Sequence, residues 1–130
     1  MSSLRILLVD DHEVVRLGLR SLLDRHPGFD VVGEASAEAE AVQKALELLP
    51  DLVLMDIRLA GGSGVDACQQ IMLLLPETKV IMLTSYAEDE MLLLQFGRAL
   101  PGYVLKQVGS NDLIRAIEAA SRGKRRLIPP

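Results

Sequence analysis

The stretch that most constrains the fold is Leu52-Val53-Leu54-Met55-Asp56, a run of large apolar residues that ends at a single carboxylate. A short apolar run without polar alternation is typical of a strand that is buried on both faces, as in a parallel sheet. Asp56 then lies at the carboxyl end of a central strand. Open parallel sheets place ligands and chemistry at that edge, because the adjoining loops leave a crevice there. Asp56 is therefore the first candidate functional residue.

The rest of the chain alternates between strand and helix patterns. Ser36 and Ser110 are suitable N-caps, and residues 58–64, with three glycines, are expected to form a loop. This alternation predicts a doubly wound α/β domain with a parallel sheet and right-handed crossovers. The predicted strands span residues 5–9, 29–35, 52–56, 79–84 and 102–106, and the predicted helices span 14–26, 37–49, 65–75, 88–98 and 112–122.

Composition excludes several classes of protein. At 130 residues, 49% hydrophobic and 25% charged, the chain is a single globular domain. A net charge of −4 argues against a general nucleic-acid-binding face. The single cysteine, Cys68, cannot form an internal disulfide and is predicted to be a core residue. The apolar run at residues 4–9 is too short for a signal peptide or a membrane span, so a cytoplasmic location without membrane contact is expected.

Polar residues able to do chemistry follow or end most of the predicted strands. They are Asp10 and Asp11 after the first strand, Asp56, Thr84 and Lys106. Because the carboxyl ends of parallel strands share one edge of the sheet, we expect these residues to converge. Carboxylates a few ångströms apart repel one another by about 4 kcal/mol per adjacent pair at an effective dielectric constant of 20. One lysine does not offset that repulsion, whereas a divalent cation does.

An all-oxygen cluster favours Mg²⁺, which takes one or two carboxylates together with phosphate oxygens. A carboxylate beside Mg²⁺, with a hydroxyl and an ammonium group opposite, is suited to phosphoryl transfer onto the carboxylate. The residues themselves therefore predict phosphorylation of Asp56. His12 and His26 are expected to be surface residues at helix ends, since they show no metal-ligand spacing.

These residues resemble those of the receiver domain of bacterial two-component response regulators. The opening Val9-Asp10-Asp11-His12-Glu13 and the segment Gly102-Tyr103-Val104-Leu105-Lys106 are similar to the NarL/FixJ subfamily. The resemblance implies a flavodoxin-like receiver fold with five parallel strands in the order 2-1-3-4-5 and five helices. The chain departs from the family after the acceptor, where the loop reads Ile57-Arg58-Leu59-Ala60-Gly61 and the family usually has a Met-Pro pair.

The resemblance also implies a role for each site residue. Asp56 corresponds to the phosphoacceptor and Asp11 to a direct Mg²⁺ ligand, while Asp10 supports the metal partly through water. The backbone carbonyl of Arg58 completes the protein ligands.

Three further residues correspond to the switch machinery of the family. Thr84 carries the hydroxyl that moves towards the phosphoryl group, and Tyr103 is the aromatic switch. Lys106 is the ammonium that pairs with the phosphoryl group.

The family further implies partners and domain limits. A sensor histidine kinase donates the phosphoryl group, and phosphorylation promotes a homodimer. DNA is bound only through a C-terminal output domain. Residues 1–122 would form the receiver domain and residues 123–130 the start of a linker. Such a domain is not a metabolic enzyme, because it catalyses only its own phosphorylation and dephosphorylation.

Three other classes of protein fit these residues less well. A phosphatase of the haloacid-dehalogenase type needs a second Asp two residues after the first, and that position is Arg58. A flavodoxin-like FMN binder needs a Ser/Thr/Gly-rich loop after the first strand, where Asp10 and Asp11 would instead repel the phosphate. A receiver-like interaction module without phosphorylation would be expected to have lost acidic or lysine positions, and this chain retains them.

Overall fold

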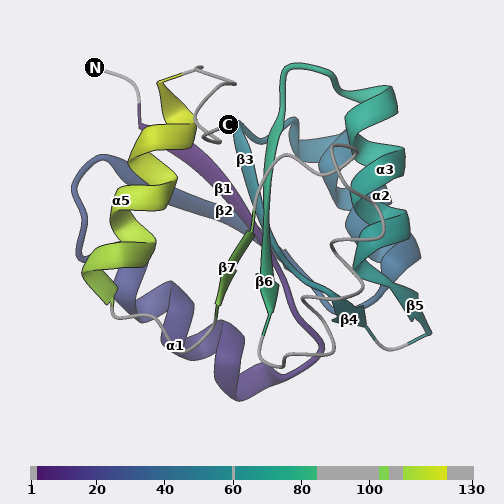
Figure 1. Ribbon diagram of the computed structural model, residues 1–130, viewed down its shortest axis with the longest axis horizontal. Coiled ribbons are helices and arrows are strands. Elements are labelled where there is room, and N and C mark those ends of the chain that lie inside the picture. Colours follow the sequence, from purple (N-terminus) through teal and green to yellow (C-terminus); the bar gives the residue numbers. More distant parts are fainter. Residues whose placement is uncertain (1–2, 60, 85–102, 106–109, 123–130) are drawn as a thin grey trace.

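The computed structural model describes residues 3–59, 61–84, 103–105 and 110–122 (Figure 1). Strands and helices alternate along the chain, as the sequence predicts. The elements are β1 (Leu4–Val9), α1 (Glu13–Asp24), β2 (Phe29–Ala35), α2 (Glu38–Leu48), β3 (Leu52–Asp56), β4 (Arg58–Leu59), β5 (Gly62–Ser63), α3 (Gly64–Leu74), β6 (Lys79–Thr84), β7 (Tyr103–Leu105) and α5 (Ser110–Ser121).

The main sheet has five strands in the order β2-β1-β3-β6-β7, and every neighbouring pair is parallel. This confirms the predicted receiver-type α/β fold and its strand order. Figure 1 shows α2 and α3 on one face of the sheet and α1 and α5 on the other. The carboxyl ends of the strands point to the lower edge in that view, where the predicted site residues of β1 and β3 are found.

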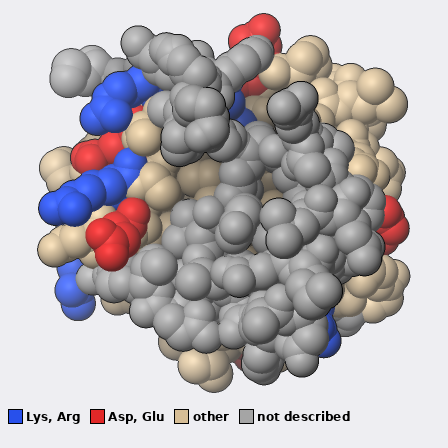
Figure 2. Space-filling model, in the orientation of Figure 1, with Lys and Arg blue, Asp and Glu red and all other residues tan. Residues whose placement is uncertain are grey.

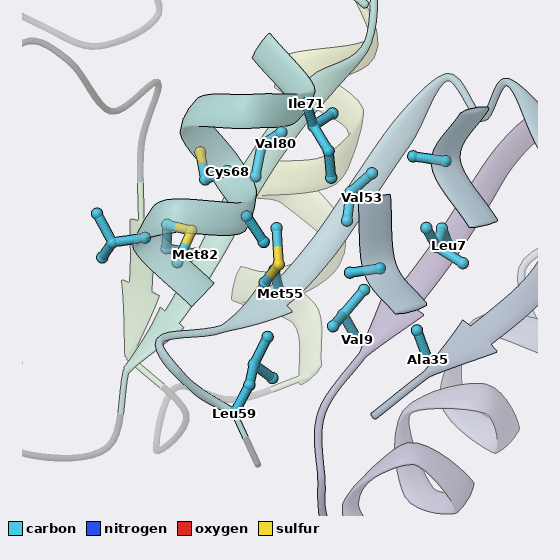
Figure 3. Packing of buried hydrophobic residues seen from close by; sticks show 14 of the residues in the cluster. Leu7, Val9, Ala35, Val53, Met55, Leu59, Cys68, Ile71, Val80 and Met82 are labelled. Atoms are coloured by element: carbon cyan, nitrogen blue, oxygen red, sulfur yellow. The ribbon is translucent and has the colours of Figure 1, made fainter. Parts of the chain in front are cut away.

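Alternate residues of the central strands fill two separate cores. Leu7 and Val9 of β1 and Val53 and Met55 of β3 belong to the cluster beneath α2 and α3 (Figure 3). Their neighbours along the same strands belong to the cluster beneath α1 and α5. Both faces of these strands are therefore buried, which explains why their sequences are apolar without alternation. The neighbours in the second cluster are Ile6, Leu8, Leu52 and Leu54.

Three local predictions differ from the structure. Ser36 is not the N-cap of α2, because the cap position is Ala37 and the Ser36 hydroxyl donates to Glu40 Oε1 at 3.2 Å instead. Ser110 is the first helical residue of α5 rather than its cap. The loop predicted over residues 58–64 contains a short antiparallel hairpin, β4–β5, in which Arg58 pairs with Ser63. The helix predicted over residues 88–98 lies outside the described residues.

Candidate functional site

The carboxyl ends of β1 and β3 bring three carboxylates together. Val9 is in register with Met55 on the neighbouring strand, so Asp10 follows β1 at the level at which Asp56 ends β3. One oxygen from each of Asp10, Asp11 and Asp56 lies within 4.8 Å of the others and of a ring nitrogen of His12. The structure thus gathers the three predicted acids at one point, together with a histidine that was expected only on the surface.

Burial makes this acidic group costly without a cation. Asp10 is fully buried and Asp56 is only 4% exposed, while the Asp11 side chain is 27% exposed. Within the described part of the chain, Asp11 Oδ1 is buried and accepts no hydrogen bond. A buried carboxylate oxygen without a donor is strongly disfavoured, because desolvation is not compensated. Mg²⁺ prefers oxygen ligands of this kind, so the residues present fit the ion.

His12 contacts both acids that follow β1. Its backbone N–H donates to Asp10 Oδ1 at 2.9 Å, and its Nδ1 lies 3.0 Å from the same oxygen. Nδ1 is also 3.0 Å from Asp11 Oδ1, although not in hydrogen-bonding geometry. The ring is otherwise 65% exposed. Sequence reasoning missed this contact, and the only available signal was that His12 directly follows the two acids.

Arg16 of α1 fixes the turn that carries Asp10. Its Nη1 donates to the backbone oxygen of Asp10 at 2.5 Å, and its Nε donates to Glu34 of β2 at 2.8 Å. Arg20 binds the other oxygen of Glu34 at 2.7 Å. Desolvation raises the pKa of Glu34, but the hydrogen bonds and charges of Arg16 and Arg20 outweigh it, so the pKa lies below its ordinary value of 4.5. These three residues were not predicted from the sequence.

The segment after Asp56 is held close to the sheet. The Ile57 N–H donates to the Leu83 carbonyl of β6 at 3.2 Å, and the Gly64 N–H donates to the Ile57 carbonyl at 2.7 Å. A Cβ atom on Gly64 would lie 1.9 Å from the backbone oxygen of Asp56, so only glycine fits there. This packing fixes the backbone that leads from Asp56 to Arg58.

Glu38 of α2 secures the hairpin from the other side. Its Oε1 accepts the Ser63 N–H at 3.0 Å, and its Oε2 accepts Gln70 Nε2 at 3.0 Å. Ser63 in turn caps α3, because its hydroxyl oxygen accepts the N–H groups of Val65 and Asp66. Although the family's usual Met-Pro is absent, the segment after Asp56 therefore forms a hairpin that is anchored to two helices.

The remaining predicted site residues belong to β6 and β7 or follow them. Thr84 is the last residue of β6, and its backbone is in register with Leu105 of β7. Leu83 is in register with Asp56, which places the end of β6 beside the end of β3. Tyr103 begins β7. The side chains of Thr84 and Tyr103, and the whole of Lys106, lie outside the described residues.

A five-stranded parallel sheet with three acids at its carboxyl edge is the arrangement that the resemblance to receiver domains implies. The chain belongs to the response regulator receiver domain family, whose family model matches residues 6–118. It resembles in particular the NarL/FixJ subfamily, among which are the LuxR-family regulators and NarL. The family consists of signalling proteins rather than metabolic enzymes.

Individual relatives agree with this assignment. Response regulator protein VraR of Staphylococcus aureus is 41% identical over 122 residues, which cover 94% of this chain and 58% of VraR. A LuxR-family two-component response regulator from Aurantimonas sp. SI85-9A1 superposes with a TM-score of 0.85 at 38% identity, covering 95% of this chain and 89% of that chain. The receiver domain of a NarL-type regulator from Mycobacterium tuberculosis superposes equally well, with 26% identity and coverage of 95% and 100%.

The chain thus spans somewhat more than half the length of the curated relatives it matches. Among the described residues, no helix is long and apolar enough to cross a membrane.

Proposed function

We propose that this chain is a phosphoacceptor receiver domain that is phosphorylated on Asp56 in a Mg²⁺-dependent reaction. One observation carries the proposal: Asp10, Asp11 and Asp56 meet at the carboxyl edge of the sheet, and one buried oxygen of Asp11 has no hydrogen-bond donor among the described residues. Membership of the receiver family supports the same function.

The three acids have different roles in the proposed reaction. Asp56 ends a buried strand, and the hydrogen bonds of Ile57 and Gly64 fix the backbone that follows it, which supports Asp56 as the acid that attacks the phosphorus atom. Asp11, Asp56 and the backbone carbonyl of Arg58 would hold Mg²⁺, and Asp10 would support the ion partly through water. When bound, the ion neutralises the repulsion among the acids and the charge on the phosphoryl oxygens.

Lys106 and Thr84 complete the proposed site. The position of Lys106 directly after β7 and of Thr84 at the end of β6 supports the view that both reach the phosphoryl group on Asp56. The ammonium group of Lys106 would pair with its oxygens, and the hydroxyl group of Thr84 would donate a hydrogen bond to them. We further propose that Tyr103 turns into the space that Thr84 leaves, which repacks this edge of the domain.

The proposed switch needs a bistable element. Phosphorylation changes the charge at Asp56 to about −2, which adds acceptor oxygens beside Thr84 and Lys106. A shift from 1:99 to 99:1 between two states needs about 5.5 kcal/mol of differential stabilisation, which two or three charge-assisted hydrogen bonds approach. The expected output is a phosphorylation-dependent homodimer.

The proposed partners follow from the family. A sensor histidine kinase in the cytoplasm would donate the phosphoryl group, and DNA would be bound only through a C-terminal output domain. On the face that Figure 2 shows, the described Lys and Arg side chains along the edge where α5 lies alternate with Asp and Glu. We place the receiver within residues 1–122, since α5 ends at Ser121, and the start of a linker at residues 123–130.

Intact-protein mass spectrometry after incubation with acetyl phosphate and Mg²⁺ tests the proposal. We expect one phosphoryl increment on the wild-type protein and on Asp66→Asn, an exposed acid of α3 that serves as the control. Asp56→Asn should show none. An increment on Asp56→Asn as large as on the wild type would place the acceptor elsewhere, and turnover of a small phosphomonoester would favour a phosphatase instead.

A further inference from the structure

The side chain of His12 has no role in the start of α1. His12 is the N-cap residue with an extended backbone, yet its side chain accepts no hydrogen bond from the helix. Its ring instead points to the acids, with Nδ1 3.0 Å from Asp10 Oδ1 and 3.0 Å from Asp11 Oδ1. The contact with Asp11 is not a hydrogen bond, so it places a nitrogen next to a buried oxygen that has no donor.

The 3.0 Å between Nδ1 and Asp11 Oδ1 matches the separation of neighbouring ligands on one metal ion. Two ligands that lie about 2.1 Å from a metal and at a right angle to each other are about 3.0 Å apart. Nδ1 keeps this separation from the oxygen of Asp11, the acid proposed as a direct ligand, and it lies within 4.8 Å of the contributing oxygen of Asp56. The imidazole therefore extends the three acids to a four-residue group with mixed nitrogen and oxygen donors.

We propose that His12 Nδ1 is an additional ligand that gives this site a preference for a first-row transition metal, tested here with Mn²⁺, over Mg²⁺. An imidazole nitrogen binds first-row transition metals, whereas Mg²⁺ prefers oxygen. The inference rests on the proposed metal site at Asp11 and Asp56, and it adds a residue and a metal selectivity to that site.

If His12 is only a hydrogen-bond donor and not a metal ligand, removing its ring changes the metal affinity in the opposite direction. If Nδ1–H only donates to Asp10, the ring must move away before any cation binds, and removing it would strengthen binding of Mn²⁺ and Mg²⁺ alike. If Nδ1 is a ligand, removing it weakens Mn²⁺ binding more than Mg²⁺ binding. His12→Ala removes the ring with little effect on packing, because the ring is 65% exposed. The backbone N–H that donates to Asp10 Oδ1 is retained.

The chain offers a matched control for a spectroscopic test. It contains only two histidines. His26 stacks on Phe29 and hydrogen-bonds to Glu118 of α5, so its ring is engaged in another part of the fold. Any imidazole nitrogen coupled to a bound Mn²⁺ can thus be assigned with His12→Ala and His26→Gln.

The experiment is pulsed electron paramagnetic resonance on the Mn²⁺-loaded full chain, with Mn²⁺ and Mg²⁺ affinities measured by titration calorimetry. We expect imidazole ¹⁴N modulation in the wild type and in His26→Gln and none in His12→Ala. The ratio of Mn²⁺ to Mg²⁺ affinity should fall at least about tenfold in His12→Ala. This is the smallest loss of metal affinity that is typical when a residue supporting a metal ligand is mutated.

Several results would overturn the inference: no ¹⁴N modulation in the wild type, modulation that persists in His12→Ala, unchanged selectivity, or stronger Mn²⁺ binding without the ring. Phosphorylation of Asp56 in the presence of Mg²⁺ distinguishes a failure of this inference from a failure of the proposed function. If the wild type is phosphorylated in Mg²⁺ but shows no ¹⁴N modulation, only the role of His12 fails. If neither ion binds and Asp56 is not phosphorylated, both the proposed function and the role of His12 fail.

Discussion

Cys68 shows how burial decides the chemistry of a single residue. Cys68 belongs to α3 and is fully buried, with its sulfur 3.6 Å from Met72 Sδ, and burial raises the pKa of the thiol to about 12. We expect no reaction with Ellman's reagent at pH 8 in the native protein and one thiol per chain after unfolding in guanidinium chloride. Rapid stoichiometric labelling of the native protein would show that Cys68 is accessible.

Glu34 predicts a pH dependence of stability. Its pKa lies below the ordinary value of 4.5, so its contribution is fully present above pH 4.5 and is lost as the pH falls through the lower, folded-state pKa. We expect Glu34→Gln to be less stable than the wild type at pH 7 by no more than about 1 kcal/mol, because the ion pairs of Glu34 with Arg16 and Arg20 are partly exposed.

Urea unfolding of the wild type and Glu34→Gln at pH 7 and pH 3.5 measures this contribution. The difference in the free energy of unfolding should narrow at the lower pH. A difference that stays constant or widens on acidification would show that Arg16 and Arg20 do not stabilise the Glu34 carboxylate.

Residues at the site were predictable to different degrees. Convergence of Asp10, Asp11 and Asp56 was predictable, because strand ends in a parallel sheet share an edge and each acid directly ends or follows an apolar run. The contacts of His12 and Arg16 were not, because they depend on side-chain orientations in a turn. The roles given to Thr84, Tyr103 and Lys106 stay predictions.

At the scale of elements, the hairpin after β3 depends on one glycine. Gly64→Ala would place a Cβ atom 1.9 Å from the backbone oxygen of Asp56, and neither backbone can yield without breaking the Gly64–Ile57 hydrogen bond. We expect a loss of about 2 kcal/mol or more in the free energy of unfolding, together with slower phosphorylation of Asp56.

Gly18→Ala in α1 is the matched control. Gly18 is exposed, and its added Cβ meets nothing within 4 Å, so the substitution should stabilise the protein by about 0.5–1 kcal/mol through helix propensity. Denaturant unfolding and acetyl phosphate labelling of both variants give the comparison. Equal stability of the two variants would show that the approach of Gly64 to Asp56 is not close.

The bounds of an element were predictable where apolar residues recur regularly along the chain. β2, β3 and β6 begin and end where predicted, because continuous or alternating apolar residues mark them. The two-residue strands β4 and β5 carry no such repeat. The cap of α2 was predicted one residue early because Ser36 binds the Glu40 side chain instead of the helix N–H groups.

At the scale of the whole molecule, the sheet order decides which residues meet. Burial of both faces of β1 and β3 indicates a parallel sheet between two helical layers, but many strand orders satisfy that pattern. The order 2-1-3-4-5 followed only from the resemblance to receivers, and the structure confirms it as β2-β1-β3-β6-β7. With β1 and β6 on either side of β3, Asp56 is the centre of the carboxyl edge.

A crystal structure of the protein with Mg²⁺ and beryllofluoride, an analogue of the phosphoryl group, tests this arrangement most directly. We expect the beryllium atom on the Asp56 carboxylate, with Thr84 Oγ1 and Lys106 Nζ each within hydrogen-bond distance of a fluoride, about 2.7–3.2 Å. Beryllofluoride on another residue, or a Lys106 or Thr84 side chain that points away from Asp56, would contradict the proposed site.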